Sequence, residues 1–264
     1  MKTIYHFSGA GNDFVVIDGR EGDVSAFREV PRIEALCKEY KTDGLMILGS
    51  GNTEVDFTME FYNPDGSGGM MCGNGGRCIV AFADYLGIRP SSGGVFLFMA
   101  PDGLHTGEIL ERPADDLWTV RIKMIDVQGI TPMLGGYFLN TGTRHFVKFV
   151  DDVEQVDVAA EGKALRWNEA FAPIGTNVNF VQVAPDGLHV RTFEKGVEGE
   201  TLACGTGLTA CALVAHHAGV PTATPGAYRL RARQDWLSVN FTPGADEKFT
   251  DVYLTGPARL VEIR

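Results

Sequence analysis

Short stretches in which apolar and polar residues alternate recur along the whole chain, and this period of two is typical of strands with one buried face. Residues 55–62 and 118–124 alternate most clearly, and Asp-Gly turns separate some neighbouring stretches. The stretches that we expect to be strands are 4–7, 14–19, 44–48, 55–62, 95–99, 105–110, 118–124, 137–140, 145–150, 177–183, 188–193, 228–233, 236–241 and 252–263. The helical spacing of apolar residues predicts amphipathic helices over 25–40 and 153–165.

Two other helix-length runs are almost wholly small and apolar, and each follows the sequence Cys-Gly-x-Gly. The cysteines are Cys72 and Cys204, and both runs end near a glycine. In each half of the chain a strand ends in a polar residue, Asn63 or Glu194, before a glycine-containing loop leads to the cysteine. This repeated order predicts an internal duplication with a boundary near residues 124–131.

Composition and charge narrow the class of protein. The chain has 264 residues, of which 44% are hydrophobic and 22% charged, so it can bury a sizeable core as one large domain or two ordinary ones. Its formal net charge of −11 argues against a nucleic-acid partner, which needs a basic surface. No apolar run approaches the roughly 20 residues of a membrane span, and no N-terminal signal pattern is found. Five cysteines, an odd number, indicate reduced thiols in a cytoplasmic protein.

Cys72 and Cys204 are the candidate chemical groups. Burial as a small hydrophobe explains an ordinary cysteine, and we assign that role to Cys37, Cys78 and Cys211. Burial does not require flanking glycines or a second copy of the arrangement. Glycines at a helix start let unpaired backbone N–H groups approach a ligand, and the positive helix end favours an anion such as a carboxylate. The same field stabilises a thiolate, so each motif combines a proton-transfer group with a carboxylate cradle.

Four other uses of the cysteines fit the spacing less well. A zinc site built from Cys72, Cys78, Cys204 and Cys211, or a thioredoxin-like redox pair, would call for Cys-x2-Cys spacing. A phosphate-binding loop would have Gly-Lys-Ser/Thr after the glycines, and a Cys–His hydrolase needs one nucleophile and one base. A symmetric pair suits stereoinversion, in which one group removes a proton from a stereocentre and the other returns one from the opposite face. A protein that binds an amino acid without catalysis is an alternative from a different class.

Five motifs carry a resemblance to a known family. They are Gly9-Ala10-Gly11-Asn12-Asp13-Phe14, Phe61-Tyr62-Asn63-Pro64-Asp65-Gly66-Ser67, Met71-Cys72-Gly73-Asn74-Gly75-Gly76-Arg77-Cys78, Thr176-Asn177-Val178, and Phe193-Glu194-Lys195-Gly196 running to Ala203-Cys204-Gly205-Thr206-Gly207. Over essentially its whole length the chain resembles the diaminopimelate epimerases, cofactor-independent amino-acid epimerases of lysine and peptidoglycan precursor biosynthesis. Proline racemase-like relatives share the paired cysteines but typically carry His where this chain has Asn74. A racemase or epimerase acting on another amino acid is the second hypothesis.

The resemblance implies roles for individual residues. Cys72 and Cys204 would be the acid/base groups that interconvert LL-2,6-diaminopimelate and meso-diaminopimelate at the α-carbon. The residues that would hold the reacting carboxylate are Gly73, Asn74, Gly205 and Thr206. The residues that would bind polar groups, mainly at the distal amino-acid centre, are Asn12, Asn63, Asn177, Glu194 and Lys195. The implied enzyme is a cytoplasmic homodimer that uses no pyridoxal phosphate, other cofactor or metal, and its partner is a small amino-acid substrate rather than a nucleic acid or a membrane.

The resemblance also implies the fold. It is α+β, with two pseudo-symmetric domains, each a β-barrel-like sheet wrapped around a central helix, and with the active site in the interdomain cleft. The final strand would return to the first domain. We therefore expect an N-terminal epimerase domain of residues 1–125 plus 253–264, which contains Cys72, and a C-terminal one of residues 126–252, which contains Cys204.

Two positions depart from the family pattern. Lys195 stands where the family commonly has Arg, and a Lys lacks the planar fork with which Arg binds a carboxylate through two hydrogen bonds. Thr143-Arg144-His145 stands where the family commonly has Asn-Pro-His. We expect Arg144 to take over part of the carboxylate recognition. His145 is explained equally well as a structural strand residue and as a site residue.

Overall fold

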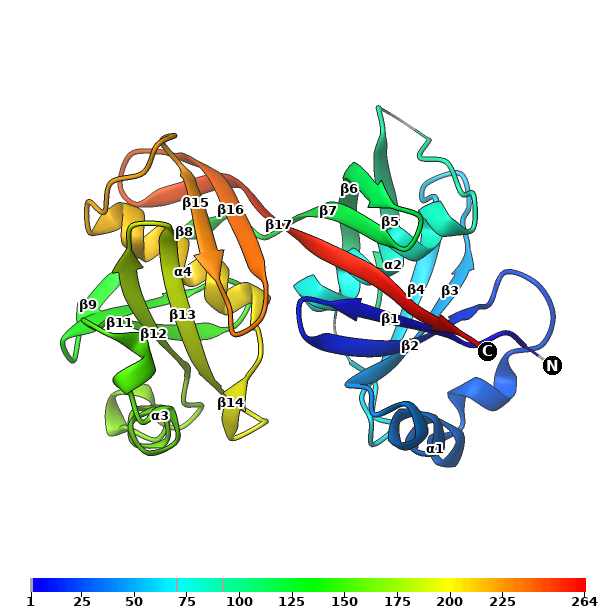
Figure 1. Cartoon of the computed structure of the whole chain (residues 1–264), viewed down its shortest axis with the longest axis horizontal. Helices are drawn as coiled ribbons and strands as arrows, with labels where there is room; N and C mark the ends of the chain where they lie inside the picture. Colours follow the sequence, from blue (N-terminus) through cyan, green and yellow to red (C-terminus); the bar gives the residue numbers. More distant parts are fainter. Residues whose placement is uncertain (1, 70, 92) are drawn as a thin grey trace. The chain divides into compact units, whose positions relative to one another are not determined.

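The computed structural model describes residues 2–69, 71–91 and 93–264. The chain divides into two compact units, one formed by Met1–Ile122 and Gly256–Arg264 and the other by Lys123–Thr255. In each unit a curved β-sheet surrounds one helix, and a further helix packs on the outside of the sheet (Figure 1). The predicted α+β class, with a barrel-like sheet around a central helix, is confirmed.

The strands of the first unit close into a ring. In ring order they are β1 (Tyr5–Gly9), β2 (Asn12–Asp18), β3 (Gly44–Ser50), β4 (Phe57–Tyr62), β5 (Val95–Ala100), β6 (Gly103–Ala114), β7 (Leu117–Lys123) and the C-terminal part of β17 (Lys248–Ile263). The β2–β3 and β4–β5 pairs are parallel, and the other pairs of the ring are antiparallel. The end of β17 closes the ring because it pairs with both β7 and β1.

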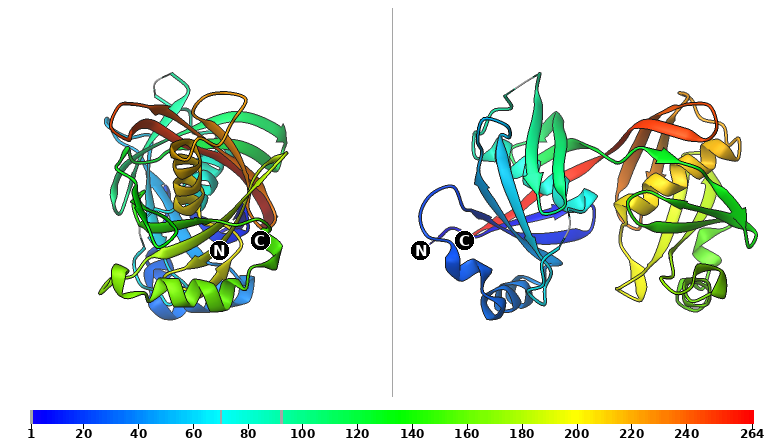
Figure 2. Two further views of the ribbon diagram at one scale, coloured as in Figure 1. Left: turned by 90° about the vertical axis from the view of Figure 1, so that its left-hand side faces the viewer. Right: turned by 180° about the vertical axis from the view of Figure 1, so that it is seen from behind.

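Helix α2 (Gly73–Tyr85) lies inside this ring (Figure 2). Its residues Gly73–Ala83 are all buried, and it contacts β1, β2, β3 and β6. The ring of Phe82 packs against that of Phe7 at 5.6 Å between centroids, and Phe7 packs in turn against Trp118 at 5.9 Å. A helix enclosed by a sheet buries every face, which explains why the run after the first cysteine is almost wholly small and apolar.

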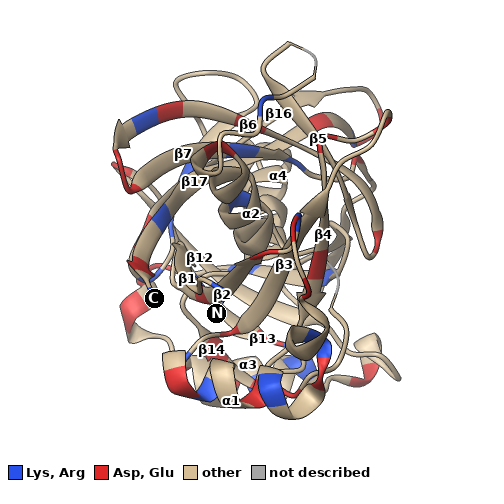
Figure 3. Ribbon diagram, turned by 90° about the vertical axis from the view of Figure 1, so that its right-hand side faces the viewer, with Lys and Arg blue, Asp and Glu red and all other residues tan. Residues whose placement is uncertain are grey.

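Helix α1 (Val30–Tyr40) covers the outer face of β2 and β3. Its buried residues Ile33 and Leu36 belong to one apolar cluster with residues of these two strands, namely Val15, Ile17, Leu45 and Ile47. Because α1 lies on one face and α2 on the other, β2 and β3 are buried on both faces and read as continuous apolar runs. Figure 3 shows charged residues on α1 and along the strands and loops, whereas α2 carries few.

The second unit has a sheet of the same kind. Its strands are β8 (Val127–Gln128), β9 (Thr131–Met133), β10 (Gly136–Asn140), β11 (Arg144–Phe149), β12 (Asn177–Ala184), β13 (Gly187–Glu194), β14 (Gly199–Thr201), β15 (Ala227–Arg231), β16 (Trp236–Pro243) and the N-terminal part of β17. Helix α4 (Gly205–His217) contacts most of these strands, and α3 (Val158–Arg166) packs against β12, β13 and β14. No helix in the described part of the chain is both long and apolar enough to cross a membrane.

Both units follow one order of strand pairing, which supports the predicted internal duplication. From β1 to β7, and again from β10 to β17, successive pairs are antiparallel, parallel, antiparallel, parallel, antiparallel and antiparallel. The outer helix, α1 or α3, joins the second and third strands of this order, and the inner helix, α2 or α4, joins the fourth and fifth. Each Cys-Gly-x-Gly motif therefore begins the central helix of its unit.

The helix predicted over 25–40 is interrupted. Residues Ser25–Arg28 form a 3-10 turn, η1, and α1 begins at Val30 after an extended residue. Pro31 lies in the first turn of α1, where its missing N–H costs nothing, but its ring clashes with a helix that continues toward the N-terminus. The proline therefore sets the start of α1.

The helix predicted over 153–165 is divided in the same way. Residues Val153–Gln155 form a second 3-10 turn, η2, and α3 begins after Asp157, whose carboxylate accepts a hydrogen bond from the N–H of Ala160 at 3.0 Å. An Asp at this position satisfies an N–H group that has no partner in the first helical turn, and so favours a helix start there. The short strands β8, β9 and β14 were not predicted either.

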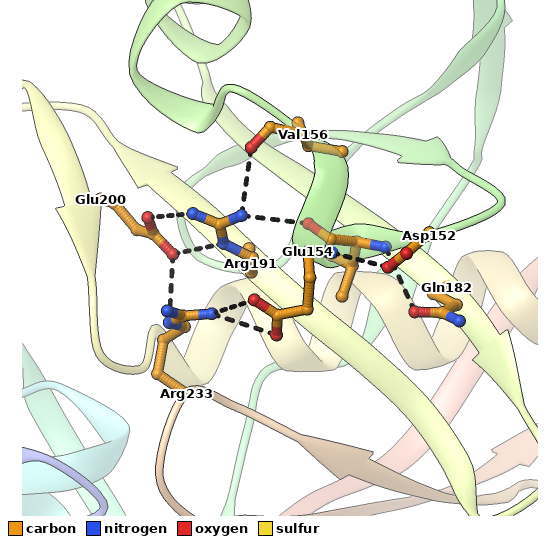
Figure 4. Close-up of polar contacts among 8 residues, drawn as sticks. Asp152, Glu154, Val156, Gln182, Arg191, Glu200 and Arg233 are labelled. Carbon is orange, nitrogen blue, oxygen red and sulfur yellow. Dashed lines mark hydrogen bonds and ion pairs between the residues drawn. The ribbon is translucent and has the colours of Figure 1, made fainter.

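An ion-pair network in the second unit fixes the segment that leads to Cys204. Arg191 of β13 donates to both carboxylate oxygens of Glu200 in β14, at 2.7 and 2.6 Å, and to two backbone carbonyls in the segment before α3, each at 3.1 Å (Figure 4). Arg233 pairs with Glu154 at 2.9 Å and approaches Glu200 at 3.5 Å. The network holds β14 against β13 and against the turn after β15.

Replacing Arg191 by Ala is expected to lower the free energy of unfolding by about 2 kcal/mol, because the Glu200 carboxylate and two backbone carbonyls lose a largely buried donor. Urea unfolding followed by circular dichroism measures the change. The control is Arg233→Ala, whose pair with Glu154 is largely exposed and should contribute less than about 1 kcal/mol. Equal losses in the two variants would show that Arg191 is an ordinary surface residue.

Candidate active site

Cys72 occupies the N-cap position of α2. Its backbone is extended, with φ −105° and ψ 153°, and its Sγ accepts a hydrogen bond from the N–H of Gly75 at 3.2 Å. The residue is exposed, whereas the helix behind it is buried. N–H groups without helical partners and the helix dipole make this end of α2 attractive to anions. Cys72 therefore presents an accessible sulfur where a thiolate is stabilised.

Two predicted substrate-binding residues, Asn12 and Asn74, are joined to each other next to Cys72. The Nδ2 of Asn74 donates a hydrogen bond to the Oδ1 of Asn12. Asn74 is 3% exposed and Asn12 is half-buried. A Cβ on Gly9 would lie 2.7 Å from the carbonyl oxygen of Asn74, so a glycine is needed where β1 approaches the start of α2. The first glycine of the Gly-Ala-Gly-Asn motif thus allows Asn12 and Asn74 to meet.

Asn63 lies in the loop between β4 and α2. Its Nδ2 donates to the Oγ of Ser67 at 3.0 Å, and its N–H donates to the carbonyl of Ser67 at 2.9 Å. Asp65 accepts a hydrogen bond from the N–H of Ser67 in the same turn. Within residues 2–69, 71–91 and 93–264, the hydrogen bonds of Asn63 all lie in this turn. Its role in binding substrate stays a prediction.

Cys204 occupies the corresponding N-cap position of α4 and is 9% exposed. Its Sγ lies 3.5 Å from the Oγ1 of Thr206. The same hydroxyl lies 3.0 Å from the Nε2 of His145 and 3.2 Å from the Oγ1 of Thr143. The hydroxyl of Thr141 donates to the carbonyl of Thr206 at 2.9 Å and holds the first turn of α4 in place. Cys204 thus stands beside a cluster of hydroxyl groups and an imidazole.

The neighbours of His145 place its proton on Nε2. The Nδ2 of Asn179 donates to the carbonyl of Phe146 at 3.1 Å and lies 3.1 Å from the Nδ1 of His145. The hydroxyl of Thr192 donates to the Oδ1 of Asn179 at 2.9 Å. A carbonyl only accepts, so the amide nitrogen of Asn179 must face it, and the Nδ1 of His145 must then be an acceptor. The Nε2–H of His145 therefore faces the hydroxyl groups of Thr143, at 2.9 Å, and Thr206, at 3.0 Å, and the hydroxyl of Thr206 also lies next to the sulfur.

Full burial lowers the pKa of His145 to about 3, so the imidazole is neutral at neutral pH. In the unfolded chain the same residue takes up a proton below about pH 6.5. Acidification therefore favours the unfolded chain, and between about pH 6 and pH 4 this residue should cost about 1.4 kcal/mol of unfolding free energy per pH unit. Urea unfolding at pH 7 and pH 5 should show a shallower pH dependence in His145→Gln. Equal pH dependence in the variant and the original chain would contradict a buried neutral His145.

Asn177 connects the segments that carry the two departures from the family pattern. Its Nδ2 donates to the carbonyl of Arg144 at 2.9 Å and to the Oγ1 of Thr143 at 3.3 Å. Its Oδ1 accepts a hydrogen bond from the backbone N–H of Lys195 at 2.8 Å. Asn177 is 4% exposed, and its three hydrogen bonds fix the backbone of Arg144 and Lys195 and the hydroxyl of Thr143. Its role in binding substrate stays a prediction.

Arg144 has other partners than those expected. Its guanidinium donates to the carbonyl of Phe171, in η3 (Glu169–Phe171), at 3.2 Å and lies 5.1 Å from the centroid of the Phe138 ring. These contacts hold the guanidinium against the apolar core beside η3. They argue against the expectation that Arg144 takes over part of the carboxylate recognition.

The other cysteines are structural, as predicted from their sequence context. Cys37, Cys78 and Cys211 are buried. Burial raises the pKa of each of these thiols, so they stay protonated and unreactive at neutral pH. Only Cys72 and Cys204 stand at the N-terminus of a helix among the cysteines of this chain.

Several residues that hold the site were not singled out from the sequence. They are buried polar side chains, namely Arg77, Thr141, Asn179 and Thr192. A buried polar group requires hydrogen-bond partners, so a polar residue inside an apolar run signals a network. Arg77 interrupts the apolar helix after Cys72, and Asn179 interrupts a buried strand. A Cβ on Gly207 would lie 2.5 Å from the Oδ1 of Asn179, which explains the second glycine of the Cys204 motif.

Solved structures of other proteins share the duplicated fold of this chain. A phenazine biosynthesis protein of the PhzF family from Bacillus anthracis has the same fold, with a TM-score of 0.75 at 11% identity over 100% of this chain and 98% of that one. A hydroxyproline epimerase from Agrobacterium vitis aligns with a TM-score of 0.65 at 15% identity, over 100% and 91% of the two chains. At these identities the similarity concerns the fold.

Sequence similarity identifies the family to which the chain belongs. The sequence model for diaminopimelate epimerase matches residues 4–92 and 137–261. The diaminopimelate epimerase of Chlorobaculum tepidum is 40% identical over 263 residues, which cover 96% of this chain and 97% of the relative. That of Flavobacterium psychrophilum is 37% identical over 262 residues, with coverage of 98% and 97%. The chain belongs to the diaminopimelate epimerase family, and it is therefore an isomerase.

Proposed function

We propose that the chain interconverts LL-2,6-diaminopimelate and meso-diaminopimelate without a cofactor, as a step in the synthesis of lysine and peptidoglycan precursors. The observation that carries the proposal is the duplicated N-cap cysteine, because each unit presents a sulfur at the first turn of its central helix. In the proposed enzyme the domains are residues 1–125 plus 253–264 and residues 126–252, and each contributes one cysteine to the reaction of a single substrate molecule. Cys72 and Cys204 then face one α-carbon from opposite sides.

Each turnover removes one proton and returns another. The thiolate of one cysteine takes the α-proton as the C–H bond breaks, and the electron pair left on the carbon is delocalised into the adjacent carboxylate. The thiol of the other cysteine donates its proton to the opposite face of the carbon and becomes a thiolate. In the reverse direction Cys72 and Cys204 exchange these roles, so the two thiols account for all protons moved.

The reacting carboxylate is assigned to the first turns of α2 and α4. The groups that would bind it are the backbone N–H groups and side chains of Gly73, Asn74, Gly205 and Thr206. The N–H groups of a first helical turn have no partner within the helix, so they remain available to a ligand. Negative charge grows on the carboxylate as the α-proton leaves, and each fixed donor at this place is expected to raise the rate by roughly 10²–10³-fold.

The distal amino-acid centre is assigned to the remaining predicted residues, namely Asn12, Asn63, Asn177, Glu194 and Lys195. The hydroxyl of Thr201 donates to the Oε2 of Glu194 at 2.9 Å and orients that carboxylate at the end of β13. A carboxylate suits the distal ammonium group of the substrate. Lys195 follows directly and would bind the distal carboxylate as a single point charge.

The proposal also includes the oligomeric state and the cellular location of the enzyme. A homodimer and a cytoplasmic location are the expectations that come with the family resemblance and with reduced cysteines. Size-exclusion chromatography with light scattering distinguishes a dimer from a monomer. A monomer with full activity would remove the dimer from the proposal and leave the chemistry as it stands.

The proposed function is tested by α-proton exchange in D2O under reducing conditions, followed by proton NMR. With LL-2,6-diaminopimelate, the α-proton signal should fall while the signals of the meso isomer grow. Exchange of proline or another amino acid, without exchange of diaminopimelate, would favour the alternative of a racemase with a different substrate. Binding of diaminopimelate without exchange at any pH would favour an amino-acid-binding protein that is not an enzyme.

A further inference from the structure

Arg77 is a completely buried cation inside the first unit. Its guanidinium donates to the carbonyls of Gly73 at 3.1 Å, Gly9 at 3.3 Å and Pro257 at 3.3 Å, and to the Oδ1 of Asn74 at 2.8 Å. These four acceptors come from α2, β1 and β17, so Arg77 ties the start of the central helix to two strands. Burying a guanidinium is costly unless its N–H groups are satisfied, and these acceptors satisfy them in a specific geometry.

We propose that Arg77 is a positioning residue that sets the orientation of the side-chain amides of Asn74 and Asn12, so that Asn12 offers its NH2 group to a carboxylate of the substrate. The proposal rests on the proposed function for the identity of that substrate. Beyond that function, the proposal states that Asn12 recognises a carboxylate and that Arg77 determines this preference.

The orientation follows from what each group can donate. A guanidinium only donates, so the atom of Asn74 that faces Arg77 must be its oxygen. The amide nitrogen of Asn74 is then turned toward Asn12, where it requires an acceptor, and the oxygen of Asn12 provides one. The nitrogen of Asn12 is left on the other side of that amide. A single buried cation thus fixes two amides in sequence.

Asn12 therefore offers a hydrogen-bond donor, its Nδ2 group, to a ligand. Within residues 2–69, 71–91 and 93–264, no acceptor receives a hydrogen bond from the Nδ2 of Asn12, and the residue is half-buried. A carboxylate of the substrate can accept from this nitrogen. An ammonium group, which only donates, would meet at Asn12 an oxygen that already accepts the hydrogen bond from Asn74. If the amide of Asn12 were reversed, its oxygen would face the substrate and would favour an ammonium group over a carboxylate.

The second unit provides a comparison for the structural part of the role. Thr209 stands five residues after Cys204, as Arg77 stands five after Cys72. The hydroxyl of Thr209 donates to the carbonyl of Gly205 at 2.9 Å, which corresponds to the contact of Arg77 with the carbonyl of Gly73. A threonine thus suffices for this backbone contact in α4. The contact with Asn74 is what Arg77 adds.

A double-mutant cycle on KM for LL-2,6-diaminopimelate tests the proposal. Arg77→Lys keeps the positive charge but loses the planar guanidinium with its several N–H donors. Asn12→Ala removes the amide on which Arg77 is proposed to act. Each single variant should raise KM by about tenfold, with a smaller change in kcat, and the double variant should be no worse than Asn12→Ala. If the two effects multiply, Arg77 does not act through Asn12, and the proposal is overturned while the epimerase function stands.

Two further variants separate positioning from a general loss of structure. Asn74→Asp still accepts from Arg77 but cannot donate, so the amide of Asn12 should turn around and KM should rise at least as much as in Asn12→Ala. An unchanged KM in Asn74→Asp would count against the proposal. Thr209→Val removes the matched contact in α4, and any effect it has should multiply with that of Asn12→Ala. Thermal unfolding shows whether each variant is folded.

A measurement without substrate keeps the proposal testable if diaminopimelate proves not to be turned over. In the ligand-free protein, the side-chain amide protons of Asn74 should exchange slowly with solvent in nitrogen-edited NMR spectra. In Arg77→Lys they should exchange faster, and the signals of Asn12 should shift. Unchanged signals of both amides in Arg77→Lys would overturn the proposal, whatever the substrate is.

Discussion

Replacing either Cys72 or Cys204 by Ala should lower kcat/KM for epimerisation of LL-2,6-diaminopimelate by about 10³-fold or more, because each variant lacks one of the two proton carriers. The remaining cysteine stands on one face of the α-carbon and cannot complete an inversion. Formation of the meso isomer, separated by chiral chromatography, measures the loss in both directions. Exchange of the α-proton without inversion is compatible with this account, since one thiolate can still act alone.

The matched controls are Cys78→Ala and Cys211→Ala. These cysteines lie on the same two helices, about two turns from the N-caps, and are completely buried. Their removal leaves small cavities that cost stability, but kcat/KM of the folded protein should stay within about threefold. Full epimerase activity in Cys72→Ala or Cys204→Ala would end the two-base proposal, and a loss in the controls as large as in those variants would point to general damage.

The next largest effect on catalysis, a fall in kcat, is expected for Thr206→Val. The hydroxyl of Thr206 stands between the Nε2 of His145, at 3.0 Å, and the Sγ of Cys204, at 3.5 Å, and hydrogen bonds through it can stabilise the thiolate. Valine keeps the shape and loses the hydroxyl, so kcat should fall by about 10²-fold, as for the loss of one pre-organised donor in other enzymes. The pH dependence of kcat should also shift, because the ionisation of Cys204 loses a hydrogen-bond partner.

Thr206→Ser is the control for this prediction, because serine retains the hydroxyl without the methyl group. Its kcat should remain within about threefold of the original value. Steady-state kinetics between pH 6 and pH 9 compare the two variants. Equal kcat values for Thr206→Val and Thr206→Ser would show that the hydroxyl does not assist Cys204.

The parts of the site that could be predicted from the sequence are those with a local signature. Cys72 and Cys204 could be found because Cys-Gly-x-Gly and the apolar run after it are contiguous in the chain, and because the arrangement occurs twice. Most strands could be found from their alternation, for example residues 118–124, which contain nearly all of β7. The start of α1 was misplaced because apolar periodicity continues across Pro31.

The hydrogen-bond networks could not be predicted because they depend on strand register. Asn179 reaches His145 because β11 and β12 are parallel with His145 opposite Asn177, and it reaches Thr192 because these two residues are direct partners across β12 and β13. A shift of one residue in either pair would turn Asn179 to the other face of the sheet. Nothing in the local sequence specifies that register, so neither the proton position on His145 nor its link to Thr206 could be derived.

The charge of Arg77 was visible in the sequence, but its partners were not. Its acceptors include Pro257, which lies 180 residues away in the chain and is brought alongside by the return of β17 to the first unit. A buried cation in an apolar helix signals that partners exist and does not say which they are. The orientation of Asn12 follows only once the contact between Asn74 and Asn12 is known.

The fate of the α-proton early in a reaction of LL-2,6-diaminopimelate in D2O tests the two-cysteine mechanism most directly. If Cys72 and Cys204 serve opposite faces of one carbon, the newly formed meso isomer should carry deuterium at the inverted centre from the first turnovers, while the unreacted LL isomer keeps its proton. Mass spectrometry of the separated isomers measures both. Protium in the new meso isomer, or deuterium entering the LL isomer as fast as the meso isomer forms, would show that one group serves both faces.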